Sequence, residues 1–243
     1  MIKDEYENMR RLDQSHWWFL GMTAIILGVL NRYYKNRNDL EILDAGSGTC
    51  WLSSPLGRYG KVTALDIEPA VLNVCRERGV ERVVSGDVQK IPLADSSFDL
   101  VVCSEVLYHQ YVRNDRQAMR EFFRILKPGG RVLVKVPAHA YLSGSHDQVN
   151  LTRERYEIDG VRKLFLETGF QIDFLSFANF FLLPLVFLKR KMEKIFQSKP
   201  ESDIKKTNAL FNFLLTGILK FEALLLSKIS LPGGSSIIAV GQK

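Results

Sequence analysis

Cysteine and histidine are scarce in this chain, which limits the chemistry that either residue can supply. Its 243 residues include 3 cysteines and 4 histidines. Cys50, Cys75 and Cys103 form an odd set without CxxC spacing, so we expect three small buried residues in a reducing compartment. The histidines lack metal-ligand spacing, and we expect no metal site.

Long apolar runs and an organised basic surface are also missing. The longest apolar run that we identify, residues 177–188, is shorter than the roughly 20 residues that cross a bilayer. Residues 1–18 are too polar and acidic for a signal peptide, so we expect a cytoplasmic protein. The net charge of +6 is scattered, without an RNA-binding signature or a basic arm. The sequence therefore favours a solvated surface over a nucleic-acid partner.

Short β-branched runs alternate with helical segments along most of the chain. Strands are expected at residues 41–45, 61–67, 82–87, 98–106, 129–136, 171–177 and 237–242, and helices at 5–34, 69–79, 113–127 and 152–169. This alternation predicts an α/β fold with a Rossmann-like, doubly wound, mainly parallel sheet of seven strands. An N-terminal helix and a hydrophobic helical insertion at residues 177–230 would elaborate it.

The stretch "ILDAGSGTC" (42–50) ends a predicted strand with closely spaced glycines. Such a turn lets a nucleotide approach the backbone, and an acidic residue about 20 positions on accepts hydrogen bonds from ribose hydroxyls. Asp66 stands at that distance, at the end of the second predicted strand, and Asp87 stands at the tip of the third. Together they predict a nucleoside site.

In order, "LDAGSGT", "ALDIEP", "GDVQKIPLADSSFDLVVCSEVLYH" and "RILKPGGRVLV" resemble the class I S-adenosylmethionine-dependent methyltransferases over about residues 40–137. "HWWF" (16–19) and the final "LPGGSSIIAVGQK" are similar to a type 11-like bacterial subgroup of these enzymes. The resemblance implies S-adenosyl-L-methionine as cofactor and S-adenosyl-L-homocysteine as product. It also implies one domain, residues 1–243, made of a helical lid (1–38), a cofactor-binding core (39–137), an acceptor-side loop, helix and strand (138–176), the insertion (177–230) and a last strand (231–243).

The resemblance also implies the roles of individual residues in cofactor binding. The methionine part would lie among Asp44, Gly46, Ser47 and Gly48. The ribose and one face of the adenine would contact Asp66 and Ile67, and the adenine edge would meet Asp87 and Val88. The methyl end would be lined by Ser104 and Glu105. Cys50 stands where the family usually has glycine, and we expect it to be a tolerated packing substitution rather than a reactive thiol.

On the acceptor side, His109 and His146 are the candidate general bases, with Asp147 as a partner that would orient His146. Each histidine has an alternative role in holding its surface loop. The residues that would form a lid or contact the acceptor are Tyr6, Trp17, Trp18, Phe19 and Tyr108. The alternative for the adjacent aromatics is a helix face packed on the sheet.

We expect methyl transfer by in-line displacement to an O, N or C nucleophile of a small, partly hydrophobic molecule, such as a natural-product, glycan or lipid intermediate. The alternatives are a tRNA methyltransferase and a non-catalytic cofactor-binding partner protein. Residues 177–230 would cap an apolar acceptor pocket, form a homodimer face, or rest on a membrane beside the basic cluster Lys189–Lys194.

Overall fold

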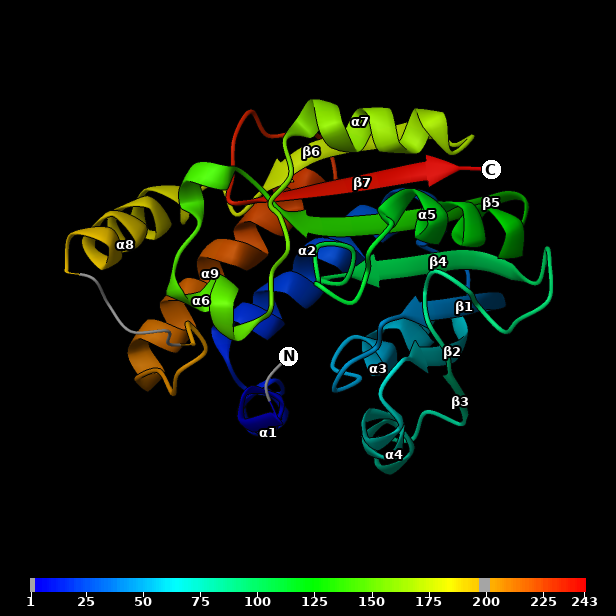
Figure 1. Cartoon of the computed structure of the whole chain (residues 1–243), viewed down its shortest axis with the longest axis horizontal. Coiled ribbons are helices and arrows are strands. Elements are labelled where there is room, and N and C mark those ends of the chain that lie inside the picture. The colour runs from blue at the N-terminus through cyan, green and yellow to red at the C-terminus, as the bar shows by residue number, and fades with distance from the viewer. Residues whose placement is uncertain (1–2, 197–201) are drawn as a thin grey trace.

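The computed structural model describes residues 3–196 and 202–243, and its centre is a seven-stranded sheet (Figure 1). The strand order is β3-β2-β1-β4-β5-β7-β6. The strands are β1 (Leu40–Ala45), β2 (Gly60–Asp66), β3 (Arg82–Ser85), β4 (Phe98–Ser104), β5 (Leu126–Pro137), β6 (Gln171–Ala178) and β7 (Ser236–Gln242). β7 is antiparallel to β5 and β6, and the other pairs are parallel. The predicted Rossmann-like, mainly parallel sheet is confirmed.

Helices cover both faces of the sheet, as the continuously apolar strands require. On one face Ile42 packs in a buried cluster with α2 (Trp17–Tyr34), α3 (Ser53–Leu56) and α9 (Ala209–Leu226). On the other face Leu43 packs in a cluster with α5 (Asp115–Ile125) and α7 (Ile158–Glu167). Successive strand residues point to opposite faces, which is why Ile42 and Leu43 belong to different cores.

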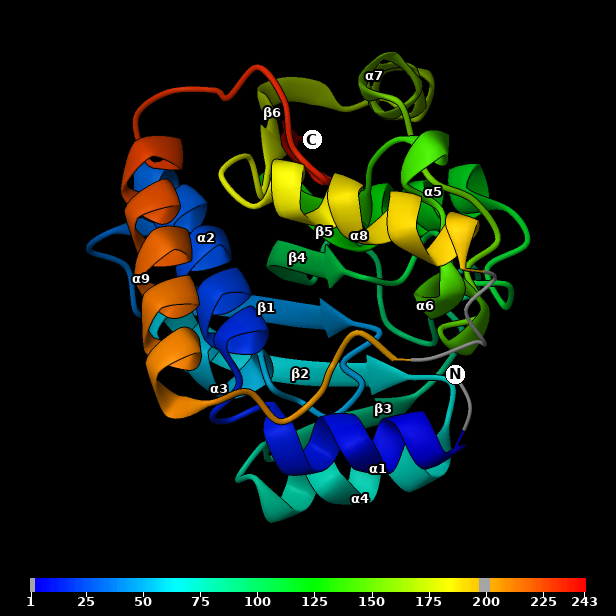
Figure 2. The same ribbon diagram turned by 90° about the vertical axis from the view of Figure 1, so that its left-hand side faces the viewer.

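The edge of the sheet formed by β2 and β3 is covered by α4 (Pro69–Glu77), which packs in a small third cluster. α1 (Lys3–Leu12) lies alongside α4 (Figure 2) and is joined to it by Arg10–Glu77 at 2.6 Å. A second ion pair, Asp13–Arg78 at 2.7 Å, has a fully buried carboxylate. The N-terminal segment is thus fixed beside β2 and β3, the strands at whose carboxyl ends we expect the nucleoside.

The N-terminal helix is broken, whereas we expected one helix over residues 5–34. It stops at Leu12, where the Asp13 carboxylate is committed to Arg78. α2 then starts at Trp17, and the His16 Nδ1 accepts a hydrogen bond from the Trp18 amide at 3.3 Å. Side chains that satisfy backbone amides in this way begin new helices.

Two further expectations about the second half of the chain need correction. α6 (Ser145–Val149) occupies a stretch that we expected to be a loop, and α7 begins at Ile158, later than expected. The 177–230 range contains α8 (Leu183–Ile195) and α9, while its residues 197–201 lie outside the described part. Two short 3-10 helices, Gly57–Tyr59 and Ala140–Leu142, complete the elements.

α9 also corrects the expectation that no segment is apolar and long enough to cross a membrane. Its 18 residues pass that test by length and composition, and 22% of them are buried. Lys220 and Glu222 divide the segment into shorter apolar runs in the sequence. A single such helix is weak grounds for a membrane span, because core helices of other proteins have the same composition.

Candidate functional site

The glycine turn after β1 lies against the end of β2. The Leu65 carbonyl accepts hydrogen bonds from the amides of Gly46 at 2.7 Å and Ser47 at 3.0 Å. Gly46 has a φ of 79°, and a Cβ there would lie 2.3 Å from a Val106 methyl carbon. Only glycine fits this turn without strain. The turn therefore brings the backbone amides of residues 46–48 to the carboxyl edge of the sheet, where ligands bind in folds of this kind.

Asp44 lies beneath this turn and is 3% exposed. Burial raises the pKa of its carboxyl from 3.8 to about 7, and the nearby charge of Asp66 acts in the same direction. The Ser53 hydroxyl donates a hydrogen bond to it at 2.5 Å, which opposes the rise. Among the described residues no cation pairs with Asp44, so this acid can accept hydrogen bonds from a ligand or donate one to it.

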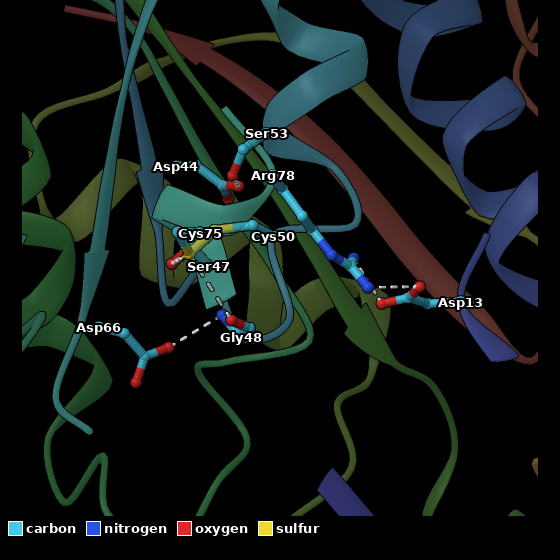
Figure 3. The surroundings of a disulfide bond; sticks show 9 residues. All are labelled: Asp13, Asp44, Ser47, Gly48, Cys50, Ser53, Asp66, Cys75 and Arg78. Atoms are coloured by element: carbon cyan, nitrogen blue, oxygen red, sulfur yellow. Dashed lines mark hydrogen bonds and ion pairs between the residues drawn. A yellow bond between two sulfur atoms is a disulfide. The ribbon is translucent and has the colours of Figure 1, made fainter. Parts of the chain in front are cut away.

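Asp66, at the end of β2, is brought to the glycine turn as expected. Its carboxylate accepts a hydrogen bond from the Gly48 amide at 2.9 Å (Figure 3) and another from the Glu68 amide at 3.0 Å. Burial raises the pKa of this carboxyl, and the hydrogen bond from Glu68 is the first of those that oppose the rise. The next residue, Ile67, is 50% exposed, which leaves an apolar surface beside the carboxylate.

Asp87, after β3, is occupied within its own loop. It accepts hydrogen bonds from the Gln89 amide at 2.8 Å and from the Gln89 side chain. The Val88 side chain is buried in the core, so only its backbone can face a ligand. Gln89, which we did not expect, also bonds the Tyr111 carbonyl and the Asn114 amide, and so joins this loop to the segment after β4.

Cys50 and Cys75 are joined by a disulfide, contrary to the expectation of three free thiols. The bond connects the glycine turn to α4, directly behind the residues expected to bind the cofactor (Figure 3). Cys50 has a φ of 56°, a left-handed conformation that the glycine usual at this position adopts freely. Cys103 is free and buried, as expected.

Comparisons with known proteins point to the same part of the chain. Residues 43–134 match the methyltransferase domain family. This segment is similar to that family over 92 residues, from the end of the first strand to the fifth. Sequence relatives include a malonyl-acyl-carrier-protein O-methyltransferase of Serratia marcescens, 37% identical over 95 residues that cover 38% of this chain and 36% of that protein. The ubiquinone/menaquinone biosynthesis C-methyltransferase UbiE of Azotobacter vinelandii is 32% identical over 148 residues, which cover 52% of this chain and 58% of its own.

The chain thus spans about a third to three fifths of the lengths of these two relatives. The fold match is more complete. A Thermotoga maritima methyltransferase structure, described as a possible histamine N-methyltransferase, covers 99% of this chain and 95% of its own, with a TM-score of 0.60 and 17% identity. The fold is therefore that of class I methyltransferases, whose family implies S-adenosylmethionine as cofactor.

Three buried polar atoms without a partner in the described part of the chain support a fit to this cofactor. The Ser104 Oγ, the Thr49 Oγ1 and the Tyr6 hydroxyl are buried without a hydrogen-bond partner among the described residues. Buried polar atoms of this kind call for a ligand or water. Burial raises the pKa of Tyr6 to about 12. Tyr6 packs against the buried cluster that contains Cys50, Ala64 and Cys75, next to the glycine turn.

The other lid aromatics pack largely on the protein itself. Phe19 is 2% exposed and contacts the Trp51 ring at 5.5 Å between centroids. Trp17 and Trp18 are partly buried against the cluster beneath α2 and α9. Their packing agrees with the alternative that we left open, a helix face on the sheet, and their role as a lid stays a prediction.

The methyl end contains a partly buried ion pair that we did not expect. Lys135 of β5 is fully buried and pairs with Glu105, which has a φ of 62° just after β4. The Trp18 ring centroid lies 5.2 Å from the Lys135 ammonium. Tyr108 is buried beside this pair, and burial, followed by the Glu105 charge, raises its pKa well above the usual value. Parallel pairing of Ser104 with Lys135 could have suggested that the two strand ends meet.

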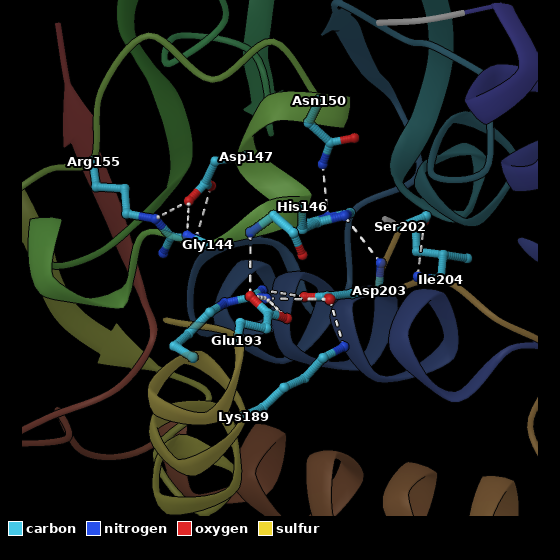
Figure 4. Close-up of polar contacts among 12 residues, drawn as sticks. Gly144, His146, Asp147, Asn150, Arg155, Lys189, Glu193, Ser202, Asp203 and Ile204 are labelled. Atoms are coloured by element: carbon cyan, nitrogen blue, oxygen red, sulfur yellow. Dashed lines mark hydrogen bonds and ion pairs between the residues drawn. The ribbon is translucent and has the colours of Figure 1, made fainter. Parts of the chain in front are cut away.

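The two candidate bases are placed differently. Burial lowers the pKa of His109 to about 4, and its Nδ1 accepts a hydrogen bond from the Tyr111 amide at 3.3 Å. His146 is more deeply enclosed (Figure 4), and burial lowers its pKa also. The Nδ1 of His146 accepts from the Asp203 amide at 3.1 Å, and its Nε2 lies 2.7 Å from the Asn150 amide group.

Asp147 is not the orienting partner of His146. It pairs with Arg155 at 2.9 Å instead and accepts a hydrogen bond from the Gly144 amide. Because the His146 Nδ1 accepts a hydrogen bond, neutral His146 carries its proton on Nε2. The side-chain oxygen of Asn150 has no partner among the described residues. Rotating the side-chain amide by half a turn would let this oxygen accept a hydrogen bond from the His146 Nε2. These contacts anchor residues 202–204, and a catalytic role for His146 stays a prediction.

Proposed function

We propose that the chain transfers a methyl group from S-adenosylmethionine to an O, N or C nucleophile of a small, partly hydrophobic molecule. The observation that carries the proposal is the meeting of Asp66 with the Gly48 amide at the carboxyl edge of the sheet. When bound, the cofactor supplies an electrophilic methyl group on a cationic sulfur. The functions of the two sequence relatives, O-methylation and C-methylation, favour oxygen or carbon among the possible acceptor atoms.

The chain's own residues would act mainly by positioning. Asp66 and Ile67 would hold the nucleoside, and Asp44 would accept hydrogen bonds from the methionine part. Holding two reactants in line can supply about 7–11 kcal/mol of the barrier reduction. The Trp18 ring already stabilises one cation, the Lys135 ammonium, and an aromatic face of this kind also stabilises a sulfonium.

A general base is needed only for an acceptor that loses its proton early. With a pKa of about 4, His109 is neutral at pH 7 and able to accept a proton. We favour His109 over His146 because the His146 contacts with the Asp203 amide and with Asn150 already serve to hold the chain at residue 203.

We further propose that the protein belongs to the type 11-like bacterial subgroup and is cytoplasmic. Because thiols in the cytoplasm are normally kept reduced, the Cys50–Cys75 bond would form there only under oxidising conditions. For residues 177–230 we propose a cap that completes the core through the inner face of α9. Its outer face is free for a membrane or a second copy.

Transfer of a labelled methyl group tests the function directly. Purified protein and labelled S-adenosylmethionine would be incubated with a metabolite extract or with bulk RNA, after calorimetry has shown cofactor binding. Label in a small molecule is expected. Label in RNA would instead indicate a tRNA methyltransferase, and cofactor binding without transfer to either pool would indicate a non-catalytic partner protein.

A further inference from the structure

The outer face of α9 is apolar although nothing in the described chain covers it. Phe213, Leu224 and Leu210 are 74%, 67% and 64% exposed. The exposed apolar residues of the helix follow one side at helical spacing, and they are Leu210, Phe211, Phe213, Leu214, Ile218, Phe221 and Leu224. A helix that packs on a core needs only its inner stripe to be apolar. The outer stripe therefore has a separate explanation.

The inner face of α9 is firmly attached to the fold, which excludes a role for this helix as a membrane span. Gly21 of α2 packs so closely on Leu219 that a Cβ there would lie 2.1 Å from a leucine methyl carbon. Glu222 is fully buried and accepts hydrogen bonds from the Asn179 and Phe181 amides. A span would have to break these contacts and bring Glu222 into lipid.

α8 continues the apolar surface. Leu185, Leu188, Met192 and Ile195, with Phe196 just after the helix, are exposed on one side of it, while Phe187 lies on another side against the Tyr141 ring. The start of this helix and the middle of α9 are joined by the Phe181 and Phe221 rings, whose centroids are 5.7 Å apart. Figure 2 shows α8 crossing the face of the molecule that α9 borders. We name the exposed apolar residues of α8 and α9 the apolar face.

The charges around the apolar face are positive. α8 and α9 contain only two acidic residues, of which Glu193 is paired with Arg190 and Glu222 is buried. The exposed basic residues on and beside the two helices are Lys189, Lys191, Lys194, Lys205, Lys206, Lys220 and Lys228. Lys189 is partly neutralised by Asp203. An exposed apolar stripe with lysines at its sides is typical of helices that lie in a membrane interface.

We propose that the apolar face binds the surface of a bilayer that contains anionic lipids, with α8 and the outer side of α9 lying in the interfacial layer. A second copy of this chain fits less well. A symmetric dimer through the same face would bring the lysines of the two helices together, and α8 and α9 have no exposed carboxylate to balance them. An anionic bilayer accepts both the apolar side chains and the positive charge.

Vesicle flotation of the full chain tests this proposal. We expect the protein to float with vesicles of phosphatidylcholine and phosphatidylglycerol, and much less with phosphatidylcholine alone. Replacing one apolar residue on each helix, Leu188→Ser with Leu214→Ser, should weaken binding to the mixed vesicles on the order of tenfold or more. The matched control is Leu166→Ser on α7, since Leu166 is 59% exposed and Leu188 is 55% exposed.

Charge reversal measures the electrostatic contribution to vesicle binding. Lys191→Glu with Lys220→Glu should weaken binding to the mixed vesicles on the order of tenfold, while Lys61→Glu, an exposed lysine of β2, should have little effect. Absence of flotation, or flotation that both pairs of variants leave unchanged, overturns the proposal. A dimer in solution that Leu188→Ser with Leu214→Ser dissociates assigns the face to a second copy.

This test is independent of the proposed function. Cofactor binding measured by calorimetry in the absence of lipid reports on the glycine turn and not on α8 or α9. A protein that floats without binding S-adenosylmethionine would overturn the proposed function and leave the membrane surface standing. A protein that binds S-adenosylmethionine without floating would overturn the membrane proposal and leave the proposed function standing.

Discussion

The carboxyl ends of the parallel strands form one edge of the sheet, and the carboxylates on its two halves are stabilised in different ways. The first half comprises the ends of β1 and β2 with the segments that follow them, and the second half the ends of β4 and β5 with the segments that follow them. Asp44 and Asp66 accept hydrogen bonds from a hydroxyl and from backbone amides, and no cation pairs with them among the described residues. Glu105 and Asp147 are paired with Lys135 and with Arg155. The first half therefore keeps its acids available to a ligand. The second half commits them to cations, and its chemistry must come from other groups or from the acceptor.

The largest effect is expected where the second half depends on an internal ion pair. Lys135→Ala should lower the free energy of unfolding by about 2–5 kcal/mol, because it removes a fully buried side chain, opens a space under Trp18 and leaves the partly buried Glu105 without its cation. Urea denaturation measures this loss. Lys127→Ala is the control, since Lys127 also belongs to β5 and also pairs with a carboxylate, but its side chain is 38% exposed whereas that of Lys135 is fully buried; pairs open to water contribute about 0–1 kcal/mol. Equal losses in the two variants would contradict the contrast.

The first half should depend instead on its disulfide. The bond closes a loop with a sequence separation of 25 residues, for which chain entropy predicts a stabilisation of about 3 kcal/mol. A thiol reductant should therefore lower the unfolding free energy of the wild type. The double variant Cys50→Ser with Cys75→Ser should be insensitive to the reductant. A wild type equally insensitive would mean that both residues remain thiols, as the sequence led us to expect.

The uncompensated acid Asp44 should make stability depend on pH. Its pKa is raised from 3.8 to about 7, so the folded chain holds this proton more tightly than the unfolded chain does. The contribution is greatest below pH 4 and is lost as the pH rises to about 7. Between pH 5 and pH 8 wild type should lose on the order of 2–3 kcal/mol relative to Asp44→Asn. Parallel pH profiles of urea denaturation for the two proteins would show that Asp44 does not titrate in this range.

The first half of the edge was the more predictable from sequence. Asp44, Gly46, Gly48 and Asp66 follow strands and turns whose signals are local, and the parallel topology brings strand ends together without further information. The positions of these residues in the fold were therefore accessible, although their roles in cofactor binding stay predictions. The break between α1 and α2 could not be predicted, because it depends on the ion pair of Asp13 with Arg78, which lies 65 positions away at the end of α4.

The second half depends on contacts that no local pattern specifies. His146 meets Asp203 across 57 positions, and Glu222 meets the Asn179 amide across 43. The first half has one contact of the same kind, the Cys50–Cys75 bond, which has no recognisable spacing and is revealed only by the packing of α4 on the glycine turn. Composition predicted that residues 177–230 are helical and apolar. It could not show that the outer side of α9 would remain uncovered.

Asp66 offers the smallest effect and the sharpest test of the comparison. Its carboxylate is free to bond ribose hydroxyls, and a charged hydrogen bond contributes about 1.5–3 kcal/mol. Asp66→Asn should therefore weaken S-adenosylmethionine binding by about tenfold to a hundredfold in calorimetry. Glu68→Gln, the exposed acid two residues on, should leave the affinity unchanged. If Asp66→Asn binds as tightly as wild type, the uncompensated acids do not serve the cofactor, and the difference between the two halves has another cause.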